Sequence, residues 1–485
     1  MAITSASGPD AAPRKQTLAS NYVDFTSSAT EGWAQQYLPD LMEKEAEIYG
    51  KRTIAGFLNQ VGAEEASTSD RVIWSEQGRL HLAYTATCNS SGDTSANVFS
   101  IVNDVDGNSV GINHGIRVGD TVLVSQAGAT IRGFVTDADA GTDDDVTILP
   151  YSHADCDAAG LTDDSTAGAF RILVFGSEFA KGQDGRSSAN EPKFKSHMNK
   201  HIILKDYYEV SGSDTSAIGW VEVAGEQGQN GYLWYLKAEG DTRARFTDYL
   251  EMSMMEGELS LAAAASGVPT NAGDTGADGS GTEGLFKAIE NRGHQTTGVT
   301  GVNASTDLAE FDAILAVFDQ NGAIEENMMF VNRATSLAMD DMLASMNSYG
   351  AGGTSYGVFN NSEDMALNLG FSGFRRGSYD FYKSDFKYLN DKGTRGALND
   401  TVNNIRGVVV PAGVSSVYDE QLGTNMKRPF LHVRYRASQT DDRRLKTWIT
   451  GSVGAATSGK DVMEVHYLSE RCLVTQGANN FMLMN

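Results

Sequence analysis

The chain has 485 residues, 40% of them hydrophobic, which is enough for two or three domains or for one core with large insertions. Its formal net charge of -25 argues against a tight or sequence-specific nucleic-acid binder, because such proteins need a basic face. Nowhere do about eighteen apolar residues run together, so no membrane-spanning helix is expected.

The cysteines and the N-terminal residues indicate in which cellular compartment the protein is expected. Cys88, Cys156 and Cys472 are an odd number and lie far apart, so no disulfide framework follows and a reducing compartment is expected. The first residues, MAITSASGPDAAPRKQ, lack the basic-then-apolar order of a signal peptide. We therefore expect a soluble protein that is made inside a cell.

The first third of the chain changes pattern twice. An apolar stripe within 31–61 predicts a helix or broken helix, and alternation over 72–84 predicts a strand. Between about 97 and 180, short β-branched runs are separated by Gly and Asp turns, which predicts a small β-barrel or sandwich. The flanking strands, near 72–84 and 201–210, would pair as a long hairpin, so the β domain is expected as an insertion near its tip.

The second half predicts helices and then strands. A helix is expected at about 231–265, bent or interrupted at Gly240. A second helix follows near 305, capped by Ser305 or Thr306, and then a strand at Met328–Val331 with a third helix behind it. The segments IRGVVVPAG, RPFLHVRYRAS, KTWITGSVG and DVMEVHYLSERCLVTQ predict closing strands.

His197 and His201 are four residues apart, the spacing at which two imidazoles on one helical turn could share a metal ion. The residues that follow, HIILKDYYEVSGSD, alternate apolar and polar side chains, which indicates a strand. In a strand the two histidines would lie about 13 Å apart. With no third ligand suggested, we expect architecture here and no metal site.

Acidic loops offer a second possible site. Asp137, Asp139 and Gly141 faintly resemble a calcium loop, but the EF-hand pattern also needs a further ligand, a terminal Glu and flanking helices. Residues 133–170 hold nine Asp and no Lys or Arg. A solvated acidic rim, with Asp143–Asp145 as a charged turn, is the favoured interpretation, and cation binding stays open.

The other motifs do not predict a catalytic or ligand-binding site. His153 and Cys156 have a zinc-like gap without two further partners, and the glycines of 350–357 lack the Lys-Ser/Thr of a phosphate loop. The acidic pairs Glu64–Glu65 and Glu325–Glu326 are expected on the surface. Methionines at helical spacing are expected to fill a core rather than to form a binding face: Met339, Met342 and Met346. No catalytic residue, cofactor or metal is predicted, and we do not expect an enzyme.

The order of elements resembles the major capsid proteins of tailed bacteriophages, whose fold also occurs in herpesvirus shells and encapsulins. The matching stretches are HIILKDYYEVSGSD, TRARFTDYLEMSMMEGEL, ENMMFVNRATSLAMDDML and GVVVPAGVSSVYDE. The resemblance implies an α+β fold with an N-terminal arm, an extended β-hairpin loop, a spine helix and an axial α/β domain. The inserted β domain departs from the family pattern.

On this resemblance the chain divides as follows: 1–70, arm and helix; 71–214, extended loop with the insertion at about 97–180; 215–300, peripheral domain with the spine helix; 301–400, axial domain; 401–485, closing strands. The implied function is a self-assembling icosahedral shell of hexamers and pentamers around double-stranded DNA. The implied partners are neighbouring capsomers, a portal, and decoration or scaffolding proteins, with no membrane. The implied location is the virion, after assembly in the host cytoplasm.

Two other classes stay open. An acidic, calcium-binding surface-layer protein, or another β-rich structural protein, would predict a signal peptide and loss of order on chelation. An enzyme would predict carboxylates with perturbed pKa values converging in one pocket.

Overall fold

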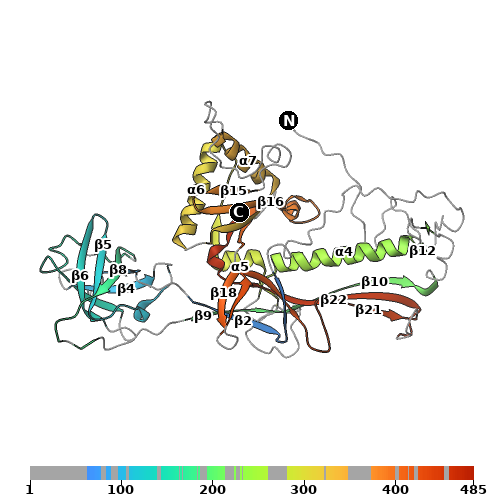
Figure 1. The fold of residues 1–485 in the computed structure, drawn as a ribbon, viewed down its shortest axis with the longest axis horizontal. Helices are drawn as coiled ribbons and strands as arrows, with labels where there is room; N and C mark the ends of the chain where they lie inside the picture. The colour runs from blue at the N-terminus through green and yellow to red at the C-terminus, as the bar shows by residue number, and fades with distance from the viewer. Residues whose placement is uncertain are drawn as a thin grey trace. The chain divides into compact units, whose positions relative to one another are not determined.

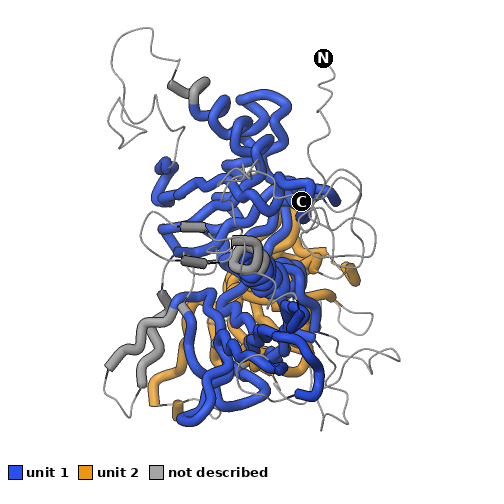
Figure 2. Tube along the Cα trace, turned by 90° about the vertical axis from the view of Figure 1, so that its right-hand side faces the viewer, with its two compact units in different colours: residues 1–74, 198–485 blue, residues 75–197 orange. Residues whose placement is uncertain are grey.

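A computed structural model describes the following residues: 63–77, 83–88, 97–104, 107, 109–138, 144–162, 164–166, 168–182, 184–185, 194–213, 223–224, 230–231, 233–259, 281–321, 324–347, 373–398, 404–412, 414–419, 424–452 and 458–485. The expected N-terminal arm and the helix within 31–61 lie outside these residues. The chain mixes helices with many strands, as predicted (Figure 1). It divides into two compact units (Figure 2): the main unit, 1–74 with 198–485, and the barrel unit, 75–197.

A five-stranded sheet is organised around one long strand, β22 (Val462–Thr475). The strands follow the order β1 (Ala63–Ser67), β20 (Leu431–Arg436), β22 and β10 (Ile202–Ser211), with β21 (Lys446–Gly451) also paired to β22. Apolar side chains at alternate positions of β10 and β22 face one side, where the helix α4 (Leu233–Glu256) covers them with Phe246 and Leu250 (Figure 1). The helix continues through Gly240, so the predicted interruption there is wrong; a single glycine costs a helix only about 1 kcal/mol.

The predicted strand at 201–210 is confirmed as β10, but its predicted partner is wrong. Over ten residue pairs, from Ile202 opposite Arg471 to Ser211 opposite Val462, β10 runs antiparallel to β22. The 72–84 segment does not form one strand: β2 (Arg71–Gln77) and β3 (Ala83–Thr87) are separate. The β2 strand pairs with β9 (Phe194–Lys200), which the sequence prediction missed, and these two strands form a two-stranded ribbon.

The main unit contains a second large sheet, which has six strands. Its order is β13 (His294–Thr296), β23 (Met482–Met484), β17 (Gly407–Pro411), β14 (Glu326–Val331), β16 (Tyr379–Asp385) and β15 (Gly373–Arg376). The helices α6 (Ala304–Gln320) and α7 (Arg333–Asn347) pack on one face, and α5 (Leu285–Arg292), α9 (Lys387–Asn390) and the end of α4 pack on the other. Alternate residues of β14 divide between these two cores, with Met329 and Val331 on the α6 side and Phe330 on the α5 side.

The cap of α6 corrects a prediction. Asn303, and neither Ser305 nor Thr306, precedes the helix, and its side chain accepts a hydrogen bond from the Thr306 amide at 2.9 Å. Ser305 and Thr306 lie inside the first turn. An asparagine in extended backbone is as good an N-cap as serine, and the helix starts two or three residues earlier than the predicted caps imply.

The barrel unit contains a closed barrel with the strand order β3, β4 (Val98–Asp104), β7 (Asp145–Pro150), β6 (Ala129–Ala138), β5 (Asp120–Gln126) and β8 (Phe170–Ser177). Its interior is filled by alternate apolar residues such as Phe99, Ile148 and Phe170. The expected boundary at 97 leaves out β3, yet β3 is the strand that pairs with both β4 and β8 and so closes the barrel.

The remaining elements are short. Two further two-stranded sheets are β18 (Val414–Asp419) with β19 (Thr424–Pro429), and β11 (Val223–Ala224) with β12 (Asn230–Gly231). Three 3-10 turns complete the described chain: η1 (Gly111–Asn113), η3 (Arg395–Ala397) and η4 (Ala478–Asn480). Among the described residues, no helix combines the length and the hydropathy needed to cross a membrane.

Candidate functional site

Asn199 anchors the base of the ribbon. This residue is the last but one of β9, is 1% exposed, and its amide group joins three segments of the main unit. Its Nδ2 donates to the carbonyl oxygens of Leu473 in β22 at 2.6 Å and of Glu283 at 2.9 Å. Its Oδ1 accepts from the Glu283 amide at 2.8 Å and from the Thr282 hydroxyl at 3.1 Å. One neutral side chain therefore ties β9 to β22 and to the segment that precedes α5.

The other strand of the ribbon is held by an aromatic contact. Trp74 of β2 is buried, and the guanidinium of Arg292 lies 5.5 Å from the centre of its indole ring. Arg292 is fixed in turn by Glu283 at 2.6 Å and by the carbonyl oxygen of Thr475 at 3.4 Å. A cation over an indole ring contributes about 0.5–2 kcal/mol. Because Glu283 contacts both Arg292 and Asn199, both strands of the ribbon are bound to the same part of the main unit.

His201 is the single residue between β9 and β10 and is buried. Its Nδ1 is 3.1 Å from the carbonyl oxygen of Asp70, so this nitrogen carries the proton and donates it. Its Nε2 is 3.8 Å from the sulfur of Cys472. Burial lowers the pKa of His201, and burial raises the pKa of Cys472 to about 12, so the pair is a neutral imidazole and a neutral thiol. This thiol is not an activated nucleophile.

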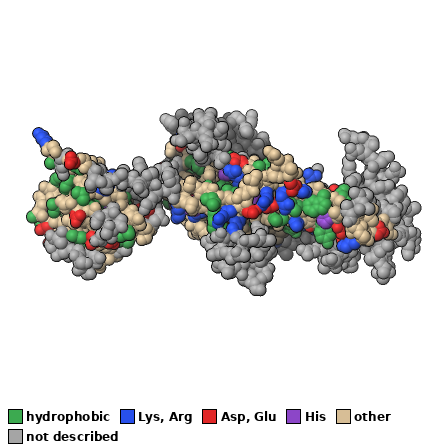
Figure 3. Space-filling view, turned by 90° about the horizontal axis from the view of Figure 1, so that it is seen from below, with side chains coloured by type: hydrophobic (Ala, Val, Ile, Leu, Met, Phe, Trp, Pro, Cys, Tyr) green, Lys and Arg blue, Asp and Glu red, His purple; other side chains and the backbone are tan. Residues whose placement is uncertain are grey.

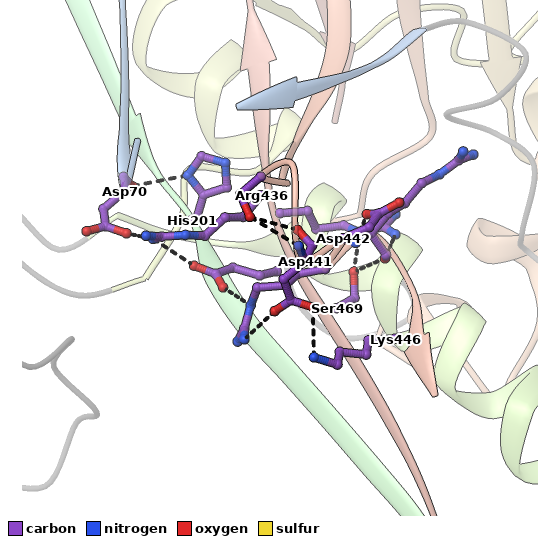
Figure 4. Close-up of polar contacts among 12 residues, drawn as sticks. Asp70, His201, Arg436, Asp441, Asp442, Lys446 and Ser469 are labelled. Atoms are coloured by element: carbon purple, nitrogen blue, oxygen red, sulfur yellow. Dashed lines mark hydrogen bonds and ion pairs between the residues drawn. The ribbon is translucent and has the colours of Figure 1, made fainter. Parts of the chain in front are cut away.

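A network of ion pairs covers the sheet face opposite α4, where Figure 3 shows blue and red side chains interspersed. Glu470 of β22 contacts Arg443 at 2.5 Å and Arg436 at 3.4 Å, and Arg436 also contacts Asp70 (Figure 4). Lys446 reaches Asp441 at 2.7 Å. These pairs join β20, β21 and β22 to the start of β2.

A second network lies on the α4 side. Glu64 of β1 contacts Arg471 of β22 at 3.7 Å and also Arg444. Burial lowers the pKa of Arg471, while the carboxylates of Glu64 and Glu251 act in the opposite direction. Because each of these charges has an opposite charge beside it, the arrangement fixes strands in register and offers no reactive group.

The two histidines of the sequence hypothesis do not form a site. His197 lies in β9 and contacts Glu76 at 3.6 Å, whereas His201 contacts Asp70 and Cys472. In the part of the chain that the structure describes, no group of three or more His, Cys, Asp or Glu residues could hold a metal ion.

The zinc-like pair of His153 and Cys156 does not form a metal site either. Cys156 is buried in the barrel, its thiol donates to the Ile148 carbonyl at 3.4 Å, and burial raises the pKa of the thiol to about 12. His153 is exposed, and among the described residues its ring contacts only the Ser152 hydroxyl, at 2.8 Å. The two residues are therefore not joined in a metal site.

The acidic and glycine-rich candidates are partly outside the structure. Asp137 lies in β6, and the Ser100 hydroxyl donates to Asp145 at the start of β7. Asp139, Gly141, Asp143 and residues 350–357 lie outside the described residues. Glu64 and Glu65 belong to ion pairs of the sheet, with Glu65 contacting Arg434 at 2.8 Å.

The methionine prediction is confirmed for the residues that can be followed. Met339 and Met342 of α7 are fully buried against α6 and the six-stranded sheet. The side chain of Met346 lies outside the described ones. Asn199 and Arg292, which hold the ribbon, carry no local signal that sequence reasoning could have used.

No protein-family model and no curated protein matches this chain. Comparison with solved structures finds similarity to structures of phages. One is from Mycobacterium phage Ogopogo, with 16% identity and a TM-score of 0.33, covering 63% of this chain and 82% of the other. Microbacterium phage Oxtober96 gives 9% identity and a TM-score of 0.37, covering 96% and 99%. The capsid structure of cyanophage P-SCSP1u gives 9% and 0.36, covering 64% and 80%. At these TM-scores the function has to be argued from the topology and the contacts above.

Proposed function

We propose that this chain is the major capsid protein of a tailed phage. It assembles through hexamers and pentamers into an icosahedral shell that encloses double-stranded DNA. The role is structural and not enzymatic. Its neighbours in the shell are other copies of the chain, together with a portal and decoration or scaffolding proteins. Assembly takes place in the host cytoplasm, and the final location is the virion.

The observation that carries the proposal is the ribbon of β2 and β9. Within the described residues it contains only two strands, while its base is fixed to the main unit by Asn199 and Trp74. An isolated two-stranded ribbon is marginally stable in water. The ribbon, which the chain anchors firmly at its base, becomes more stable if neighbouring subunits cover it. Shell subunits provide that cover.

The order of elements supports the same proposal. In it, residues 71–214 form the extended loop with the barrel inserted, and α4 is the spine helix of a peripheral domain, 215–300. The axial domain is 301–400, with α6 and α7 on its sheet. The closing strands of 401–485 divide between the sheets, because β17 and β23 join the six-stranded sheet while β20, β21 and β22 join the five-stranded one.

The charge of the chain fits a container for DNA. A net charge of -25 disfavours adhesion to the phosphate backbone, so the enclosed genome is held without sequence-specific contacts. No observation in the described residues favours the surface-layer alternative, and we do not carry it forward.

The test is to weigh the product. The full chain is expressed alone and together with its neighbouring genes, and is analysed by sedimentation and electron microscopy. Megadalton particles or hexameric and pentameric rings are expected. A folded chain that stays monomeric under every condition would contradict the proposal.

A variant on the ribbon sharpens this test. Ile73 of β2 is 60% exposed, so replacing it should leave the fold intact. Ile73→Asp is expected to prevent or strongly reduce assembly, because a carboxylate would be buried against a neighbour. Ile73→Val keeps the apolar surface and should assemble like the parent chain. Equal assembly of both variants would count against a covered ribbon.

A further inference from the structure

The outer surface of the barrel carries a set of large apolar side chains, here called the apolar face: Leu123, Phe134, Leu149, Leu173 and Phe175. The strand register brings them together, since Leu123 lies opposite Leu173, and Phe134 lies opposite Leu149. Phe175 is 56% exposed at a bulge between β5 and β8. Hydrophobic side chains are visible on the surface of this unit at the left of Figure 3.

These side chains are not part of the buried core of the barrel. Its interior is filled by the other alternate set, including Val122, Ile148 and Ile172, each 0% exposed. The outward positions of β3 are small or polar instead: Ala83, Thr85 and Thr87. Large apolar side chains gathered on one side of a closed barrel are typical of an interaction surface.

Two arginines flank the apolar face. Arg132 lies opposite Leu123, and Arg171 precedes Leu173 by two residues on the same side of β8. Both are exposed, and among the described residues neither side chain has an ion-pair partner. A partner that covers this surface should therefore present carboxylates beside small apolar groups.

The barrel itself has such a surface elsewhere. The acidic segment, residues 155–162 and 164, carries Asp155, Asp157 and Asp164, and its Asp157 and Ala158 are exposed. A symmetric contact between two apolar faces would bring the arginines of both copies together, which is repulsive. A contact between different surfaces of two copies pairs each arginine with a carboxylate.

We propose that the apolar face of one barrel binds the acidic segment of a neighbouring copy of this chain. The contact is head-to-tail, so each barrel offers one surface to each of two neighbours. Arg132 and Arg171 meet the aspartates, and the exposed methyl group of Ala158 packs on Leu173 and Phe175. This contact deepens the proposed shell function, on which it rests for the presence of adjacent copies.

Photocrosslinking in assembled full-length chain tests the contact. Phe175 is replaced by the photoreactive residue benzoylphenylalanine, and a second variant carries it at Ser109, an exposed residue that pairs with Asn103 of β4, a strand that β3 separates from β8. Irradiation at Phe175 should give chain-to-chain adducts that mass spectrometry maps to the acidic segment, and the Ser109 variant should not. Particles that form normally but give no such adduct, or adducts with another segment or protein, overturn the contact alone. If no particles form, both proposals fail.

A charge exchange gives a second measurement on the same adduct. Arg132→Glu with Arg171→Glu should lower its yield about tenfold, as expected when close opposite charges become like charges. Adding Asp157→Arg to that chain should restore part of the yield. The matched control, Asn103→Glu with Ser109→Glu, adds two carboxylates beside β4, which β3 separates from β8, and should leave the yield unchanged. An equal loss in the control would show a general charge effect and reject the proposed pairing.

Discussion

Buried polar residues, rather than reactive ones, hold the base of the ribbon. Asn199 uses both hydrogens of its amide and satisfies its oxygen, so it is buried without a charge penalty. His201 is buried as a neutral ring beside Cys472; burial lowers its pKa most, while the charge of Glu470 raises the pKa and that of Arg434 lowers it. Protonating this ring would place a positive charge in a site that excludes water, so the state of one imidazole affects the stability of the region.

The stability of the main unit should therefore depend on pH through His201. Burial holds the pKa of His201 below its ordinary value of 6.5, so above pH 6.5 the ring is neutral in both the folded and the unfolded chain. As the pH falls below 6.5, the unfolded chain binds the proton more readily, and stability is lost at up to about 1.4 kcal/mol per pH unit. Thermal unfolding from pH 7.5 to 5 should show a smaller loss for His201→Gln than for the parent.

His153→Gln is the control, because His153 is exposed. It should follow the parent chain at every pH. A His201→Gln variant with the same pH dependence as the parent would contradict the assignment.

At the scale of elements, β22 is the centre of the main unit. It pairs with β10 along one edge and with β20 and β21 in succession along the other. Gly451, at the end of β21, has a φ of +122° and approaches the β22 backbone so closely that a Cβ would lie 1.9 Å from the Val462 carbonyl oxygen. Only glycine allows β21 to lie against β22 at this point.

Gly451→Ala should accordingly break the end of the β21–β22 pairing. Both a positive φ and a backbone clash oppose the new methyl group, so a loss of more than about 3 kcal/mol in the free energy of unfolding is expected. Gly377→Ala is the matched control, since Gly377 also has a positive φ, +63°, but nothing lies within 4 Å of its Cβ position. Strain alone should cost this control about 1–3 kcal/mol. Denaturant unfolding of both variants measures the difference, and equal losses would contradict the clash.

Sequence patterns predicted local elements better than their partners. Alternation over 202–210 identified β10, but the same pattern could not say which strand pairs with it, because β2 and β22 alternate equally well. The segment FKSHMNK was missed as a strand since it contains few β-formers, and its strand conformation depends on pairing with β2.

The candidate sites were less predictable still. Asn199 donates a hydrogen bond to Leu473, 274 residues away, and no residue near it in the sequence predicts this contact. The apolar face did leave a signal. In β8 the run ILVF, residues 172–175, is apolar at both alternate sets, whereas a barrel strand with one face in water usually alternates apolar and polar residues.

The whole molecule consists of two units whose cores are separate. The buried cluster of the barrel contains only residues of 75–197, and the clusters of the main unit contain none of them. Each unit therefore has the hydrophobic core that independent folding requires.

Replacing residues 78–193 by a short Gly/Ser linker should leave the main unit folded. Protection of the β22 amides against hydrogen exchange should match that of the full chain, because no buried contact of β22 is removed. Val122→Asp, which puts a charge into the barrel core, should unfold the barrel and leave the same protection in place. Loss of β22 protection in either variant would mean that the two units fold as one.

The ribbon also determines how the chain carries force. Its strands continue directly into β1 and β10, which are the two edge strands of the order β1, β20, β22, β10. A pull transmitted through β9 acts along the axis of β10, so the hydrogen bonds of its ten residue pairs with β22 are loaded together in shear instead of opening one at a time. A pull through β2 loads the five pairs of β1 with β20 in the same way. The sheet thus acts as a mechanical junction between the ribbon and the core of the main unit.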